Sequence, residues 1–420
     1  MTDLAWIEAA ITAARPQAVA ALLRYFRNLD TAEEAFQEAC LRALKNWPVN
    51  GPPRDAAAWL IMVGRNAALD ATRKTARLAP LPDEELVSDL GDRESDMAER
   101  LDETHYRDDI LRLLFICAHP ELPATQQIAL ALRIVSGLSV KQIARAFLAS
   151  EAAMEQRITR AKAKVAGAGV PFETPGAVER SERLAAVMAM IYLVFNEGYS
   201  AGPTDDERGR LADEAVRLGR LLLRMFQTEP EVMGLLALML LQHARAPARF
   251  NAAGEIVLLE DQDRALWRTH LIQEGLALID KAMRHRQTGP YLVQAAIAAL
   301  HSRAANYADT DWAGIDALYA TLEHLTPSPV ITLNRAVAVS KTQGPQAALD
   351  MISSLEPALG GYFHFHGARG AFLLQVGQNH AAHEAFDRAI ALANTPAEAA
   401  HIRMHIDRLT AEAGSARTSA

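Results

Sequence analysis

The sequence predicts an all-α protein made of two small helical domains and a larger helical repeat domain. Half of the 420 residues are hydrophobic, alanine and leucine dominate, and alternating runs of Val, Ile and Thr are scarce, a composition that favours helices over sheets. Net charge divides the chain into four parts: residues 1–78 carry +2, 79–104 carry −8, 105–170 carry +4 and 171–420 carry −6. Two basic blocks are therefore separated by an acidic stretch and followed by an acidic half.

Composition also indicates the cellular compartment. The two cysteines, Cys40 and Cys117, stand alone in apolar helical contexts, so we expect neither a disulfide framework nor a zinc knuckle. The opening MTDLAWIEAA lacks the basic and apolar regions of a signal peptide. The longest apolar run, residues 184–195, is shorter than the roughly 20 residues that span a bilayer. We therefore expect a cytoplasmic protein that does not associate with membranes.

The first basic block contains two helical segments, LDTAEEAFQEACLRALKNWP at 29–48 and AAWLIMVGRNAALDATRK at 57–74. The second segment starts an apolar face at Trp59, which we expect in the core, with a base-stacking surface as the alternative. It continues with a basic stripe on another face. Such a stripe can contact the phosphates and bases of an opened DNA strand, although a solvated charged face is the alternative. The stripe consists of Arg65, Asn66, Arg73 and Lys74.

Residues 79–104 combine Pro, Gly and a run of carboxylates without a sustained apolar face. Such a composition cannot bury enough apolar surface to fold by itself, and its like charges repel one another. We therefore predict a flexible acidic linker between the two basic blocks.

The second basic block contains a predicted helix-turn-helix at residues 137–164. Ser139 and Gln142 form a capping box at the start of the first helix, and Ser150 is a suitable N-cap for the second. Met154, Ile158 and Ala161 share the inward face of the second helix. The other side can contact bases and phosphates in a DNA groove, although a solvated helical hairpin is the alternative. The candidate contact residues are Gln156, Arg157, Thr159, Arg160, Lys162 and Lys164.

The acidic half, residues 176–415, shows an internal repeat. Ala336, Ala348, Ile352 and Leu355 precede Gly370, Ala382, Phe386 and Ala389 by 34 residues. This period is the one expected of tetratricopeptide helix pairs, which stack into a curved solenoid. An ordinary antiparallel helical bundle is the alternative.

Several of these segments together resemble the extracytoplasmic-function sigma factors of bacterial RNA polymerase. Ala32–Glu38 and the run from Trp59 through Arg65, Asn66 and Asp70 to Arg73 are similar to sigma region 2, with Glu34 in place of the commoner Asp. The helix-turn-helix resembles region 4. The long remainder is similar to a subgroup with a tetratricopeptide-like C-terminal extension. The resemblance implies region 2 in 1–78, the linker in 79–104, region 4 in 105–170 and the extension in 176–415.

The resemblance also implies partners and contact residues. Core RNA polymerase, through its β′ clamp helices and β subunit, and promoter DNA are the expected partners. The stripe on 57–74 would contact the minus-10 element, and the outward residues of the helix-turn-helix the minus-35 element. Polymerase contacts would fall to Glu34, Gln37, Glu38 and Leu41.

The extension is expected to regulate or complete this activity through a regulatory protein or ligand. Its candidate surface residues are Asn196, Glu197, Tyr199, Asp261 and Asp263, although a helix end with Gly198 as C-cap and an N-cap role for Asp263 are simpler explanations.

Two other functional classes are alternatives to a sigma factor. One is a helix-turn-helix regulator with a sensing solenoid that acts without polymerase. The other is an enzyme, which we do not expect because the chain lacks a P-loop, a nucleophile elbow, an HExxH motif and a dinucleotide-binding glycine turn. We also expect no cofactor and no metal, since the paired histidines have no cysteine or carboxylate cluster beside them.

Overall fold

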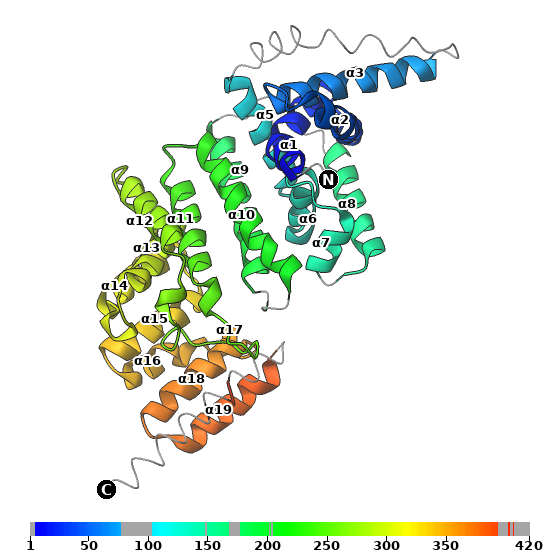
Figure 1. Ribbon diagram of the computed structural model, residues 1–420. Coiled ribbons are helices and arrows are strands. Elements are labelled where there is room, and N and C mark those ends of the chain that lie inside the picture. The colour runs from blue at the N-terminus through cyan, green and yellow to red at the C-terminus, as the bar shows by residue number, and fades with distance from the viewer. Residues whose placement is uncertain are drawn as a thin grey trace. The chain divides into compact units, whose positions relative to one another are not determined.

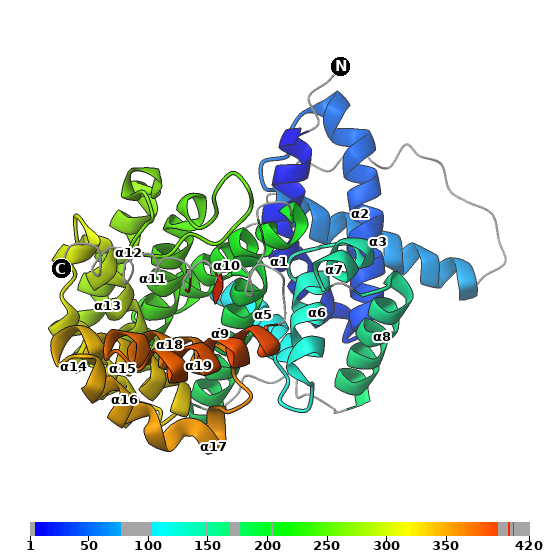
Figure 2. The ribbon, with the colours of Figure 1, turned by 90° about the horizontal axis from the view of Figure 1, so that it is seen from below.

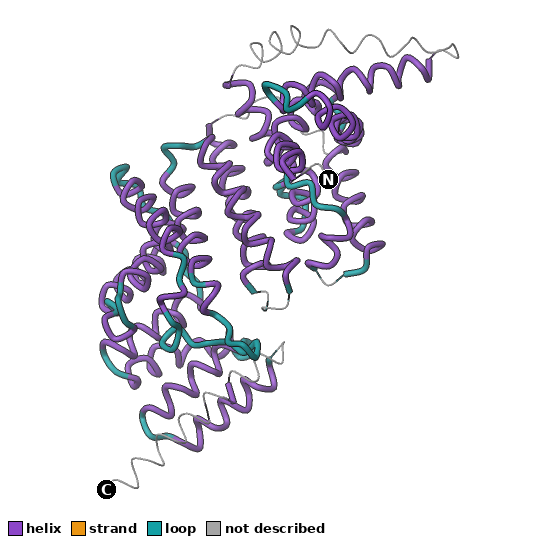
Figure 3. The backbone as a smooth tube through the Cα atoms, viewed as in Figure 1, coloured by secondary structure: helices purple, strands orange, loops and turns teal. Residues whose placement is uncertain are grey.

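The computed structural model describes residues 5–76, 103–147, 149–167, 177–200, 202, 205–393, 402–403 and 406 (Figure 1). These residues form helices and loops without a β-strand (Figure 3), which confirms the all-α prediction. The chain divides into two compact units, Met1–Gly198 and Tyr199–Ala420. Most of the predicted acidic linker lies outside the described residues. None of the described helices is both long enough and apolar enough to cross a lipid bilayer.

The first basic block forms three helices, α1 (Ala5–Phe26), α2 (Leu29–Asn50) and α3 (Ala56–Ala76). The three helices pack against one another in every pairing. Asn28 caps α2 by accepting a hydrogen bond from the backbone N–H of Thr31 at 2.9 Å, which satisfies one of the free donors at a helix start.

Aromatic side chains fill the centre of this bundle. Trp47 and Phe36 are almost completely buried, and Trp59 meets Trp47 edge to face with ring centroids 5.3 Å apart. Trp59 therefore lies in the core, as expected. A Cβ on Gly64 would approach the carbonyl oxygen of Ala35 to 2.7 Å, so a glycine is required where α3 crosses α2.

The second basic block contains four helices, α5 (Glu103–Cys117), α6 (Ala124–Ile134), α7 (Val140–Ala146) and α8 (Glu151–Gly167). Helix α8 packs on α6 and α7 through the predicted inward face: Met154, Ile158 and Ala161 are buried.

Helix α9 (Ala177–Tyr199) follows the second basic block. The guanidinium of Arg183 lies 5.8 Å from the ring centroid of Phe115 on α5. The expected C-cap at Gly198 was wrong, because the helix continues through that residue. A glycine can occupy a helix interior at a modest cost in backbone entropy, so its presence near the end of an apolar run does not fix where the helix stops.

The second unit begins with four helices, one of which is buried among the other three. These are α10 (Asp206–Met225), α11 (Pro230–Ala244), α12 (Thr269–Met283) and α13 (Pro290–Arg303). Helix α11 is apolar on nearly all sides, and such a helix must be enclosed by others. It packs against α10, α12 and α13 (Figure 2).

The end of the second unit contains two successive helix pairs. The first pair is α15 (Pro329–Thr342) and α16 (Pro345–Ile352), and the second is α18 (Phe363–Gln375) and α19 (Asn379–Leu392). Both helices of the second pair start 34 residues after their counterparts, in agreement with the repeat in the sequence. The short helix α17 (Glu356–Leu359) lies between the pairs, and α14 (Trp312–Leu325) precedes them.

The repeated small residues are buried where paired helices meet. Ala336 and Ala348 belong to one core cluster, and Ala382, Phe386 and Ala389 belong to the next. A Cβ on Gly370 would lie 2.7 Å from the Phe386 ring, so α18 and α19 approach closely at that glycine. Membership of the tetratricopeptide class stays a prediction, while stacked helix pairs are observed.

Candidate polymerase and nucleic-acid interfaces

Helix α2 presents most of its predicted polymerase-contact residues to solvent. Glu34, Gln37 and Leu41 are exposed, and they recur every three or four residues on one face. Leu41 is a large apolar side chain with 57% of its surface exposed. Glu38 is partly exposed and pairs with Arg42 at 3.0 Å within the helix. The result is a mixed polar and apolar strip suited to binding another protein.

Helix α3 carries the predicted minus-10 residues. Asn66 is exposed, and the guanidinium of Arg65 lies 5.2 Å from the ring centroid of Tyr25 on α1. Tyr25 is itself half exposed, so this pair places a cation and an aromatic ring together on the surface. The side chains of Arg73 and Lys74 lie outside those that the structure describes.

The predicted helix-turn-helix start signals are present in the second basic block. Ser139 accepts a hydrogen bond from the N–H of Gln142, whose side chain accepts one from the Ser139 N–H at 2.8 Å, which completes the capping box. Ser150 Oγ accepts a hydrogen bond from the N–H of Ala153 at 3.2 Å and so caps α8. Both helix starts were predicted correctly.

The predicted minus-35 residues separate into two groups on α8. Gln156, Thr159 and Arg160 are exposed and Arg157 is partly exposed. By contrast, Lys164 donates from Nζ to the carbonyl oxygen of Glu121 at 2.6 Å, and Lys162 points toward α2. The first group is available for a DNA groove, while the second makes contacts within the protein.

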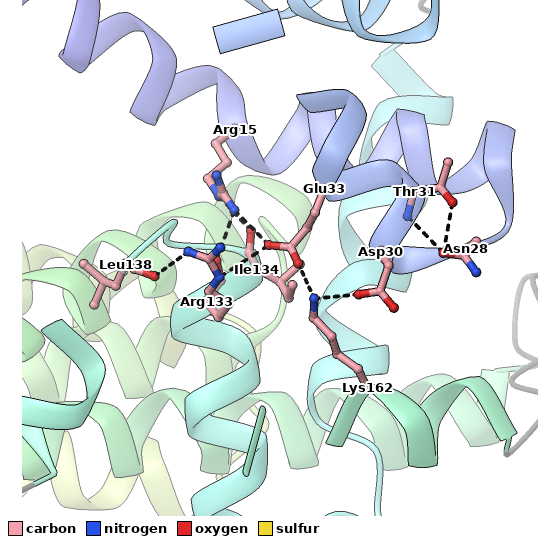
Figure 4. Close-up of polar contacts among 9 residues, drawn as sticks. All are labelled: Arg15, Asn28, Asp30, Thr31, Glu33, Arg133, Ile134, Leu138 and Lys162. Atoms are coloured by element: carbon pink, nitrogen blue, oxygen red, sulfur yellow. Dashed lines mark hydrogen bonds and ion pairs between the residues drawn. The ribbon is translucent and has the colours of Figure 1, made fainter. Parts of the chain in front are cut away.

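Lys162 belongs to an ionic cluster that the sequence did not reveal (Figure 4). Its Nζ lies 2.8 Å from Asp30 Oδ1 and 2.5 Å from Glu33 Oε2, both on α2. The Glu33 side chain is only 5% exposed and also faces Arg15 of α1 and Arg133 of α6, at 3.5 Å and 3.6 Å. We call these five residues the Glu33 cluster. It joins the two basic blocks.

Charge and burial oppose each other in the Glu33 cluster. Burial alone would lower the pKa of Lys162, but its hydrogen bonds to Asp30 and Glu33 outweigh burial, so that pKa is raised. Burial lowers the pKa of Arg15, and the Glu33 carboxylate partly offsets this effect. The carboxylates of the cluster therefore favour the charged form of Lys162 despite its burial.

The candidate regulatory residues are dispersed. In the second unit, the Tyr199 ring lies 3.7 Å from the Arg249 guanidinium, and its carbonyl oxygen accepts a hydrogen bond from that arginine. Asp263 accepts a hydrogen bond from the Ala265 N–H at 2.9 Å and caps a short 3-10 turn, as its simpler explanation predicted. Asp261 is exposed. In the first unit, Asn196 and Glu197 are partly buried near the end of α9.

Arginines hold the loops next to these residues. Arg264 donates to the carbonyl oxygens of His301 and Ala304 at 2.6 and 2.8 Å, at the end of α13. Arg245 and Arg264 both lie against the Trp267 ring, 5.6 and 4.5 Å from its centroid. Burial, together with these two cations, lowers the pKa of His301 from 6.5 to about 4.

This histidine predicts acid sensitivity of the second unit. Because the folded-state pKa of His301 lies below its ordinary value, the neutral ring is favoured in the fold and protonation favours the unfolded chain. The contribution of His301 is complete above pH 6.5 and decreases as pH falls toward about 4, by up to about 3 kcal/mol in the free energy of unfolding. Urea denaturation at pH 7 and pH 4.5 measures the free energy of unfolding. Between these two pH values it should fall less for His301→Gln than for the parent. Equal losses would contradict the prediction.

No group of three or more metal-binding side chains occurs among the described residues.

Models of three known families match successive parts of the chain. A model of sigma-70 region 2 matches residues 10–78, and one of sigma-70 region 4 matches residues 112–165. A family of unknown function (DUF6596) matches residues 183–283. An uncharacterized protein of Rhizobium meliloti (strain 1021) is 68% identical over 414 residues, which cover 98% of each chain. No solved structure matches the chain.

Proposed function

This chain belongs to the sigma-70 family, and we propose that it is an alternative sigma factor of the extracytoplasmic-function type, which binds core RNA polymerase and directs it to specific promoters. One observation carries the proposal: both matched domains keep predicted contact residues on their surfaces. Glu34, Gln37 and Leu41 line one face of α2, and Gln156 and Arg160 line one face of α8.

The proposal assigns each surface a partner. The exposed face of α2 binds the β′ clamp helices, and the β subunit is the other expected polymerase contact. On α3, Arg65, Asn66, Arg73 and Lys74 contact the minus-10 element. On α8, Gln156, Arg157, Thr159 and Arg160 read the minus-35 element, with Lys162 and Lys164 beside them. An α-helix fits the major groove of DNA, where base edges are distinguishable.

Reconstitution with core RNA polymerase tests this function. The purified full-length chain is added to core enzyme and a fragmented genomic library, and transcript start sites are mapped. We expect transcripts from a small set of sites that core enzyme alone does not use. A chain that binds duplex DNA but never directs polymerase would support the regulator alternative instead.

Arg160→Ala should relax discrimination at the minus-35 element. A bidentate arginine contact with a base supplies about 1–3 kcal/mol of discrimination, so the variant should lose roughly 10- to 100-fold preference at one base pair. The measurement is run-off transcription from a selected promoter and its single-base variants. Lys141→Ala, which removes an exposed cation from α7, is the matched control. Equal effects of the two substitutions would show that Arg160 supplies only general charge.

We further propose that the second unit regulates or completes sigma activity. It forms a compact body separate from the matched sigma regions, and stacked helix pairs commonly present a binding surface. Removal of residues 199–420 should change the transcript yield from selected promoters or its response to cell extract. Unchanged yield and response would contradict this role.

A further inference from the structure

The Glu33 cluster connects region 2 to region 4 through charges that come from both sides. Glu33 lies on α2 of region 2, and two of its three cationic neighbours, Arg133 and Lys162, belong to region 4. With a side chain 5% exposed, this carboxylate has lost most of its hydration, so its neutralisation depends on region 4 staying in place.

Arg15 makes the reciprocal contact from region 2. Its side chain is 11% exposed, and it donates to the carbonyl oxygens of Ile134 and Arg133 at 2.9 and 3.1 Å. These carbonyls end α6, where helical partners are lacking. Gly137 has φ +77°, and a Cβ there would lie 2.7 Å from Arg15 Cδ. The turn after α6 is therefore shaped around a side chain of the other region.

A second ion pair joins the regions nearby. Arg24 of α1 lies 3.2 Å from Asp109 of α5, and that carboxylate is 6% exposed. The two bridges use different helices of region 4, α6 and α8 in the Glu33 cluster and α5 in the second pair, so they fix the orientation of region 4 as well as its proximity.

Buried ion pairs are suited to a contact that must open. Desolvation of the charges offsets much of their attraction, so the net stability gained is small, whereas removal of one partner leaves unpaired buried charge. Water and new partners can rehydrate these groups once the regions separate. An apolar interface of the same size would expose surface that aggregates when opened.

Promoter binding is incompatible with this docked arrangement. The minus-10 and minus-35 elements lie about 25 base pairs apart, roughly 85 Å along B-DNA. In the structure, Lys162 of the minus-35 helix is instead bonded to α2, next to the polymerase-contact face. Region 4 therefore has to leave α2 before both elements can be bound at once.

We propose that the Glu33 cluster is an ionic latch that holds region 4 on region 2 in the free protein and opens when core polymerase and promoter DNA bind. This inference rests on the sigma function proposed above. Glu33 is adjacent in sequence to Glu34, and Asp30 lies four residues before Glu34 on the exposed face of α2, so a partner that binds this face can disturb the cluster beside it.

Energy transfer between two exposed positions in the full-length protein tests the latch. Thr12→Cys on α1 and Lys141→Cys on α7 replace exposed residues outside the predicted contact sets. Donor and acceptor maleimides at pH 7 select the new thiols: Cys117 is buried, and burial raises its pKa, while burial raises the pKa of the partly buried Cys40 to about 11. We expect efficient transfer in the free parent protein.

Glu33→Gln keeps the shape of the side chain and removes its charge. We expect the ratio of docked to undocked protein to fall by about 100-fold, as for loss of one partner of a buried pair, with a corresponding loss of transfer. Arg133→Gln should act in the same direction from the region 4 side. Glu274→Gln is the matched control, because it removes the same charge from a pair with Arg220 in the second unit and should leave transfer unchanged. Circular dichroism confirms that each variant is folded.

Two results would overturn the latch. One is parental transfer in both folded variants, Glu33→Gln and Arg133→Gln. The other is unchanged transfer in the parent when a complex with core polymerase and promoter DNA has formed. Failure to form any such complex would instead refute the proposed function, while the variants in free protein would still show whether the Glu33 cluster holds the regions together.

Discussion

Leu41→Asp is expected to weaken binding of the protein to core RNA polymerase by at least about 30-fold. A central apolar contact of a protein interface is worth about 2 kcal/mol or more, and the new carboxylate would be desolvated without a partner. Leu41 is 57% exposed in the free protein, so the substitution should leave the fold intact. The measurement is the equilibrium dissociation constant for core enzyme from fluorescence anisotropy of the labelled chain.

Leu266→Asp provides the control for this prediction. Leu266 is also a large apolar side chain, 52% exposed, but it belongs to the second unit and to neither of the matched sigma regions. The control should bind core enzyme within about twofold of the parent, since isolated exposed apolar residues contribute little. Comparable weakening by both substitutions would indicate a general effect of added charge and remove the support for α2 as the docking face.

Gly234→Ala should destabilise the second unit by about 3 kcal/mol, the upper range for overpacking. A Cβ at this position would lie 2.5 Å from the backbone nitrogen and 2.6 Å from the Cα of Leu292. Both atoms belong to the first turn of α13, which cannot rotate away as a flexible side chain could. Helices α11 and α13 would have to separate, and α11 is buried on nearly all sides. Urea denaturation followed by circular dichroism measures the change.

Gly209→Ala is the corresponding control in α10. A Cβ on Gly209 would meet no heavy atom within 4 Å beyond its own helix backbone and chain neighbours, so only backbone entropy changes. The substitution should stabilise the helix by about 0.5–1 kcal/mol. The steric explanation for Gly234 fails if both alanines change stability in the same direction and by similar amounts.

Most of the fold could be predicted from the sequence because helix caps, apolar helix faces and helix pairs depend on residues that lie close together in the chain. Ser139 and Gln142 lie three residues apart, and the capping box needs nothing else. The inward face of α8 follows from the helical spacing of Met154, Ile158 and Ala161. The 34-residue repeat predicted two helix pairs for the same reason, since each pair packs on its immediate neighbour.

The Glu33 cluster could not be predicted, because its bonded partners are up to 132 residues apart in the chain. One weak signal was present: Glu33 interrupts the face of α2 that buries Ala32 and Phe36. A carboxylate on a core-facing stripe indicates a buried cation partner, but the pattern alone cannot say which cation. Lys162 is predicted to contact DNA because it lies on a basic helix. A DNA contact of Lys162 after region 4 leaves α2 stays a prediction.

The raised pKa values of the two cysteine thiols make both cysteines unreactive toward oxidants. With a pKa of about 11, Cys40 has roughly one thiolate in 10,000 molecules at neutral pH, and thiolate is the form that peroxides attack. Cys117 is shielded still further by complete burial. Peroxides should therefore leave both thiols largely unmodified, and neither cysteine is suited to sensing an oxidant.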